Sequence, residues 1–166
     1  ESSSVHPIVK TKLPDIERHI IPADNSCLFN AIAFLMSNGE AAENGISKEY
    51  RGIVSHEILT DQTGTYSEAF LGKKPHEYAE WVQDPDKWGG EIEMSILSKR
   101  LHIQICAVDI QTGTVYKYSP EGPHEHSSIY LMYDGIHYDA VVCRMPAAKT
   151  GENHFKTIFH PESNSA

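Results

Sequence analysis

The spacing of apolar residues changes about two thirds of the way along the chain. Up to Leu101, apolar positions recur every three or four residues, which is typical of amphipathic helices. A polar turn at residues 24–26 precedes the first such segment, and its side chains can cap a helix. The pattern predicts helices over about residues 27–37, 47–61, 67–71, 76–82 and 91–100.

After Leu101, apolar residues fall in short runs separated by turn residues, as in β-strands. Strands are predicted within residues 102–110, 114–120, 127–135 and 137–144, following one another as a meander, and a short extended piece ending at Pro22 precedes the first helix. Helices first and strands afterwards indicate an α+β fold, with helices packed around a small, mostly antiparallel sheet.

The composition predicts one globular domain between two loose ends. With 166 residues and 40% hydrophobic positions, the chain can bury a single core. A serine run and prolines indicate a leader or linker over residues 1–15, and frequent Pro, Lys, Gly, Asn and Ser indicate a flexible C-terminal tail over residues 146–166. The folded domain is therefore expected over residues 16–145.

Charge and cysteine content narrow the class of protein. A formal net charge of −9 with scattered lysines and arginines argues against nucleic-acid binding. The longest apolar stretch is too short to cross a membrane, and no signal peptide opens the chain. The odd set of Cys27, Cys106 and Cys143 favours a reducing compartment over a disulfide framework. We expect a soluble cytoplasmic protein, which could also enter the nucleus.

Cys27 is the candidate nucleophile, because it follows the polar turn and opens the first apolar helix. The positive end of the helix dipole and free backbone N–H groups would lower its thiol pKa. The N–H groups of Asp24, Asn25, Ser26 and Cys27 could also form an oxyanion hole. The alternative is that Cys27 is a small core residue, which is the commoner role of a lone cysteine.

A cysteine nucleophile needs a base, and His137 is the informative histidine because it follows the Asp134-Gly135 turn between two predicted strands. Asp139 lies two residues later, so in a strand its carboxylate would face the same side and could orient the imidazole. A His-x-Asp pair is also common in surface hairpins, so this spacing alone does not establish a catalytic pair.

Three blocks of sequence resemble those of the ovarian-tumour (OTU) deubiquitinases, a family of cysteine proteases. PADNSCLFNAI resembles the family's Cys-loop (here residues 22–27) and catalytic helix, WGGEIEMSILSKRL its central helix, and IYLMYDGIHYDAV its His-loop. The blocks occur in the family's order and spacing, from about His19 to Val142. YSEAFLGK and YDGIHYD are most similar to the subgroup typified by YOD and its yeast relative.

The resemblance implies a papain-like OTU protease fold and hydrolysis of isopeptide bonds at the ubiquitin C-terminus through an acyl-enzyme. It implies Cys27 as nucleophile, His137 as general base and Asp24 as a Cys-loop residue that bears on the oxyanion hole or the charge of the site. Asp139 matches the family's acidic or amide residue two after the histidine. Either aspartate could be the third member of the triad.

The same resemblance implies ubiquitin and polyubiquitin chains as partners, a monomer, and no metal or organic cofactor. An AAA segregase ATPase would be a further partner through flanking domains that this sequence does not contain. Two alternatives remain open: a ubiquitin-binding module that has lost catalysis, and a cysteine protease for another ubiquitin-like modifier.

Other constellations are weaker. His102, Cys106, His124 and His126 lack compact metal-ligand spacing. For Trp81 and Trp88, core packing at a helix junction is favoured over a ligand cage.

Overall fold

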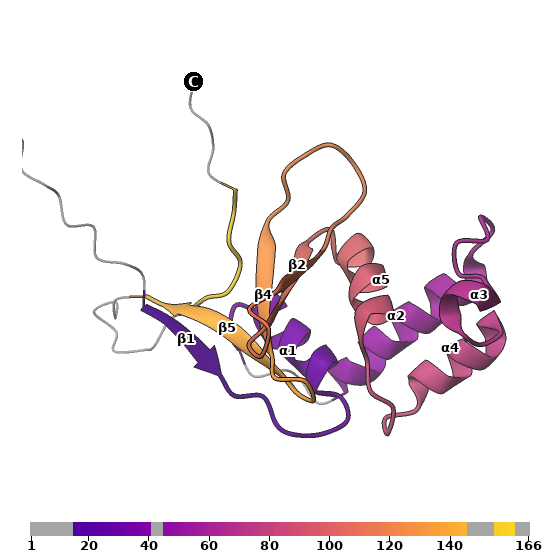
Figure 1. Cartoon of the computed structure of the whole chain (residues 1–166), viewed down its shortest axis with the longest axis horizontal. Coiled ribbons are helices and arrows are strands. Elements are labelled where there is room, and N and C mark those ends of the chain that lie inside the picture. The colour runs from indigo at the N-terminus through magenta and orange to yellow at the C-terminus, as the bar shows by residue number, and fades with distance from the viewer. Residues whose placement is uncertain (1–14, 41–44, 146–154, 162–166) are drawn as a thin grey trace, which may run out of the picture.

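The computed structural model describes residues 15–40, 45–145 and 155–161. Within these ranges the chain forms five helices and six strands (Figure 1). The helices are α1 (Cys27–Met36), α2 (Ile46–Thr60), α3 (Glu68–Leu71), α4 (Pro75–Gln83) and α5 (Glu91–Leu101). Each lies within a residue or two of a predicted helix.

Local sequence explains where several helices begin and end. Pro75 occupies the first turn of α4, where its missing N–H costs nothing. Gly72 ends α3 with a left-handed backbone, φ +69°, which glycine adopts without strain. His102 ends α5 in the same region, φ 53°.

The strands form one mixed sheet in the order β1-β5-β4-β2-β3, with β6 also pairing with β5. The strands are β1 (Asp15–His19), β2 (Gln104–Asp109), β3 (Val115–Tyr118), β4 (Ser128–Tyr133), β5 (Tyr138–Arg144) and β6 (Phe155–Lys156). Only β2 and β4 pair in parallel among the described strands, so the mostly antiparallel sheet is confirmed.

The predicted meander is wrong at one step, because β4 pairs with β2 instead of with β3. Burial explains the difference. Ile129 and Leu131 of β4 are fully buried, as is Ile105 of β2, so both strands belong in the centre of the sheet. Strand β3 carries mainly exposed side chains, which suits an edge.

Helix α1 is the centre of the core. It lies against β4 and β5 on one side and against α2 on the other, and its Phe29, Ile32 and Leu35 are fully buried. Helices α2 to α5 gather beyond it, at the end of the molecule away from β1 (Figure 1). Packing on both sides therefore fixes the first residue of α1, Cys27, close to the N-terminal end of β5.

The expected loose ends are only partly described. Asp15, assigned to the leader, is the first residue of β1, and residues 1–14 lie outside the described ranges. The expected flexible tail over 146–166 is wrong for residues 155–161. There β6 pairs with β5, and the buried Thr157 donates its hydroxyl to the Leu35 carbonyl at 2.7 Å.

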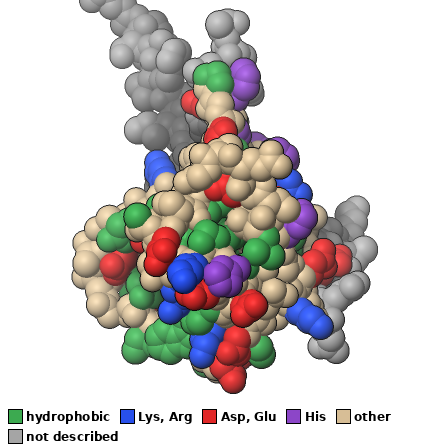
Figure 2. All heavy atoms as spheres, turned by 90° about the vertical axis from the view of Figure 1, so that its right-hand side faces the viewer, with side chains coloured by type: hydrophobic (Ala, Val, Ile, Leu, Met, Phe, Trp, Pro, Cys, Tyr) green, Lys and Arg blue, Asp and Glu red, His purple; other side chains and the backbone are tan. Residues whose placement is uncertain are grey.

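Figure 2 shows the face at the right-hand end of Figure 1. Lysine, arginine and histidine side chains there are interspersed with acidic ones, and hydrophobic side chains lie scattered between them. None of the helices in the described parts of the chain has the length and apolar composition needed to span a membrane.

Candidate active site

Cys27 is the first residue of α1, and the turn before it is tightly bonded. The Cys27 N–H donates to the Asp24 carbonyl at 3.3 Å, and the Asn30 N–H donates to the Ser26 carbonyl at 2.9 Å, which starts the helix. No side chain caps this helix end. The sulfur therefore lies where the backbone turns from loop to helix.

The Asp24 carboxylate faces into the Cys-loop and shapes its turn. Its Oδ1 accepts the Ser26 N–H at 2.8 Å, and its two oxygens accept from the Asn30 side-chain amide at 3.1 and 3.2 Å. The hydrogen bonds of Asp24 are thus with its own loop and with α1, and none found in the described chain joins it to His137.

These bonds change the expected oxyanion hole. The Asp24 N–H donates to the Pro22 carbonyl at 2.9 Å and the Ser26 N–H is held by Asp24, so neither is a free donor here. The Cys27 N–H makes only a long bond of 3.3 Å. Among the described residues, the Asn25 N–H has no hydrogen-bond acceptor, so Asn25 and Cys27 are the N–H groups best placed to hold an oxyanion.

His137 is held by the turn that precedes β5. The Asp134 carboxylate accepts hydrogen bonds from the N–H groups of Ile136 and His137 at 3.0 and 2.8 Å. Gly135, the residue after Asp134, adopts φ +101°. This local bonding lowers the pKa of Asp134. The turn delivers the imidazole to the end of β5 nearest α1.

Asp139 lies beside the His137 ring and is almost completely buried. Its Oδ1 lies 3.2 Å from His137 Nε2 and accepts the Ile21 N–H at 2.8 Å. Its Oδ2 accepts from Arg18 Nε at 2.6 Å. The Ile21 carbonyl also lies 3.1 Å from His137 Nε2, so the backbone of Ile21 fixes both side chains.

The Cys27 thiol lies next to this pair. The N–H of Tyr138, the residue after His137, helps to lower the pKa of the thiol, as does the N–H of Leu28. His137 Nδ1 has no partner among the described residues, which leaves it available to the thiol. The two halves of the site, about a hundred residues apart in sequence, are thereby brought together.

Burial is nevertheless the dominant influence on the thiol, and it raises the pKa of Cys27 above its ordinary value. The nearby charges of Asp24 and Asp139 act in the same direction. The expectation of a lowered pKa is wrong for the unassisted thiol. Formation of a thiolate at neutral pH therefore depends on proton transfer to a base such as His137.

Comparison with known proteins agrees with this arrangement. A family model described as "OTU-like cysteine protease" matches residues 22–146, which is most of the chain and includes both halves of the site. The chain belongs to the OTU-like cysteine protease family.

Several relatives of this OTU domain carry names that describe an activity. Proteins named "Ubiquitin thioesterase OTU1" are 41% identical over 146 residues in Danio rerio and 37% identical over 142 residues in Homo sapiens, covering 87% and 86% of this chain. The matched regions are 48% and 40% of those proteins, so the chain spans about half the length of these curated relatives.

Solved structures agree on the fold. A structure titled "Structure of Ovarian Tumor (OTU) domain in complex with Ubiquitin" superposes with a TM-score of 0.71 at 29% identity, covering 90% of this chain and 77% of that one. A second neighbour, an OTU deubiquitinase from Wolbachia pipientis, has a TM-score of 0.60 at 11% identity over 78% of this chain and 96% of that one. The papain-like OTU fold is confirmed.

Four further residues stabilise the OTU site, and the sequence alone did not indicate that they belong to it. Arg18 and Ile21 contact Asp139, while Arg51 and Trp88 contact the Cys-loop. Trp88 is 59% exposed and donates its indole N–H to Asn25 Oδ1 at 2.7 Å, so the expected core packing is wrong for this tryptophan. Trp81 is partly buried and packs against Tyr78, as expected.

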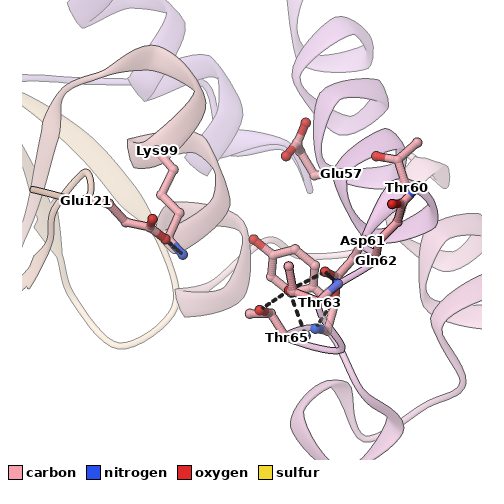
Figure 3. A pocket seen from close by; sticks show the side chains of 9 residues that line it. Glu57, Thr60, Asp61, Gln62, Thr63, Thr65, Lys99 and Glu121 are labelled. Carbon is pink, nitrogen blue, oxygen red and sulfur yellow. Dashed lines mark hydrogen bonds and ion pairs between the residues drawn. The ribbon is translucent and has the colours of Figure 1, made fainter.

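A polar hollow at the C-terminal end of α2 is separate from this chemistry (Figure 3). Asp61 there accepts the N–H groups of Thr63 and Tyr66, and Lys99 pairs with Glu121 at 2.9 Å. Most of its polar side chains thus already have partners, and its lining contains no cysteine or histidine. In the described parts of the chain, no group of three or more His, Cys, Asp or Glu side chains is placed to hold a metal ion.

Proposed function

We propose that this domain hydrolyses the isopeptide bond between the C-terminus of ubiquitin and a lysine amine. The observation that carries the proposal is the meeting of the Cys27 thiol, at the start of α1, with the loop that holds His137 against Asp139. The names of the relatives and the ubiquitin complex of a structural neighbour support ubiquitin as the modifier.

In this proposal Cys27 is the nucleophile and His137 its base. His137 takes the thiol proton through Nδ1, and the thiolate attacks the carbonyl carbon of the terminal glycine. The negative oxygen is held by backbone N–H groups of Asn25 and Cys27. His137 then returns the proton to the leaving lysine amine, and a thioester to Cys27 remains.

Hydrolysis of the thioester regenerates the enzyme. His137 removes a proton from a water molecule, which attacks the thioester carbonyl, and the thiol leaves with that proton. Asp139 orients the ring through Nε2 and stabilises the imidazolium, because it is buried and 3.2 Å away. Asp24 keeps the Cys-loop in shape by accepting the Ser26 N–H.

We also propose that polyubiquitin chains are substrates of the domain. The domain would act on them as a monomer, in the cytoplasm or nucleus. The three free cysteines support a reducing compartment. An AAA segregase partner would bind through domains outside this sequence. Light scattering of the purified domain, alone and with a chain of two ubiquitins, tests the monomer and the one-to-one complex.

Electrophilic probes test the proposed activity against its two alternatives. The domain is incubated with ubiquitin, and separately with other ubiquitin-like modifiers, each bearing a C-terminal electrophile, and the product is weighed and mapped. A ubiquitin adduct at Cys27 is expected. Binding without an adduct would instead indicate a docking module, and preference for another modifier would reassign the substrate.

A further inference from the structure

We propose that Arg51 is a positioning residue for the reaction, which locks the peptide bond between Asn25 and Ser26 so that the Cys-loop presents its donors to the oxyanion. The inference rests on the proposed function. It starts from an unusual feature of α2, a fully buried arginine that points at the catalytic loop.

The Arg51 guanidinium is buried without a carboxylate partner. In the described chain no acidic oxygen lies within ion-pair distance of it. A buried charge is costly unless its donors are used, and here Nη1 and Nη2 donate to backbone carbonyls and one hydroxyl, while the buried Nε has no acceptor among the described residues. The acceptors are Val82 O at 2.8 Å from Nη1, and Asn25 O at 3.0 Å, Ser26 Oγ at 3.0 Å, Lys87 O at 2.7 Å and Pro85 O at 3.5 Å from Nη2, which shares its two hydrogens among them.

Two of these bonds act on the residues immediately before the nucleophile. The Asn25 carbonyl accepts from Arg51, while the N–H of the same peptide unit, that of Ser26, donates to Asp24 Oδ1 at 2.8 Å. The C=O and N–H of a trans peptide point in opposite directions. Arg51 and Asp24 therefore hold this peptide plane from both sides and oppose its rotation.

The remaining bonds tie the Cys-loop to the segment after α4. Val82 and Lys87 flank that segment, and the next residue, Trp88, donates its indole N–H to Asn25 Oδ1 at 2.7 Å. The guanidinium also lies 4.3 Å from the centre of the Phe29 ring on α1. One side chain thus connects α2, the segment after α4, the Cys-loop and α1.

If the Asn25–Ser26 peptide rotates, its carbonyl dipole changes direction and the neighbouring N–H groups lose their alignment. This rotation should destabilise the tetrahedral intermediate, which needs those donors. It should change the affinity for ubiquitin and the reactivity of the thiol much less. Small misplacements of a reacting group lower rates by about 100-fold. We expect a loss of that size in kcat for Arg51→Met and a smaller loss for Arg51→Lys.

The test compares four measurements on Arg51→Met and Arg51→Lys. These are kcat with a ubiquitin-fluorophore, the inhibition constant of ubiquitin aldehyde, the dissociation constant of ubiquitin in a Cys27→Ala background, and the rate of alkylation of Cys27 by iodoacetamide. Ubiquitin aldehyde forms a tetrahedral adduct with the thiol, whereas alkylation by iodoacetamide develops no oxyanion. The matched control is Arg100→Met, which removes a half-exposed arginine paired with Glu57 on the protein surface.

The proposal predicts that kcat and aldehyde affinity fall together, while the dissociation constant and the alkylation rate stay within about threefold. Wild-type kcat in either folded Arg51 variant would overturn it, and so would an equal fall in all four quantities, which would indicate a merely structural role. Arg51→Lys keeps the buried charge, so it decides the question if Arg51→Met does not fold. A wild-type domain without activity on ubiquitin would refute the proposed function instead.

Discussion

The buried carboxylate of Asp139 gives the sharpest mutational prediction for the triad. Asp139→Asn keeps the shape of the side chain and an oxygen that can still accept the Ile21 N–H, now 2.8 Å away. It removes the negative charge that faces His137. Arg18, whose side chain is 48% exposed, can turn to solvent when its partner is neutral, so we expect the variant to fold.

The size of the effect follows from the geometry. At 3.2 Å and an effective dielectric of about 20, a carboxylate and an imidazolium attract each other by about 5 kcal/mol. Arg18, 2.5 Å from the other carboxylate oxygen, neutralises part of this field. A remaining stabilisation of about 3 kcal/mol corresponds to a rate loss of about 100-fold.

The assay is steady-state cleavage of a ubiquitin-fluorophore, with thermal unfolding as a check on the fold. Asp24→Asn is the informative comparison, because its oxygen can still accept the Ser26 N–H, and we expect it to lose less than about tenfold. Asp61→Asn, at the end of α2, is the neutral control. Retention of more than half the activity by Asp139→Asn, together with a large loss in Asp24→Asn, would refute the assignment.

Two further predictions concern packing and the thiol. A methyl group on Gly89 would lie 2.7 Å from Leu28 Cδ2 and 2.9 Å from Phe29 Cε2. Gly89→Ala should therefore destabilise the fold by about 1–3 kcal/mol and lower the melting temperature. The control is Gly52→Ala on α2, where an added methyl group meets open space, and it should not lower the melting temperature. Since burial raises the pKa of Cys27, its alkylation by iodoacetamide in His137→Ala should rise with pH at a midpoint above that of an ordinary cysteine thiol. A midpoint well below that value would show that the loop alone activates the thiol.

Local pattern was enough to predict most of the elements. Helices α1 to α5 and strands β2 to β5 were expected near their observed bounds, because their periodicity and turn residues are local signals. The pairing of β4 with β2 was missed because it depends on which strands are most deeply buried. Strand β6 was missed because two residues carry too little pattern to be distinguished from a loop.

The site shows the same division. Cys27 and His137 could be selected from sequence because each follows a recognisable turn, and Asp139 because strand spacing places it beside His137. The hydrogen bond of Arg18 to Asp139 spans 121 residues of sequence, and those of Arg51 to the Cys-loop span 25 and 26, so no local rule indicates them. The raised pKa of Cys27 was also missed, since it comes from burial among elements that are distant in the chain.

Whether Cys27 is the nucleophile is tested most directly by the activity of Cys27→Ala against ubiquitin-fluorophore, with Cys106→Ala as a control for loss of a buried cysteine remote in sequence from the site. Cys27→Ala is expected to show no detectable turnover yet still to bind ubiquitin, while Cys106→Ala, if folded, is expected to remain active. Cleavage by Cys27→Ala at a measurable rate would contradict this role of Cys27.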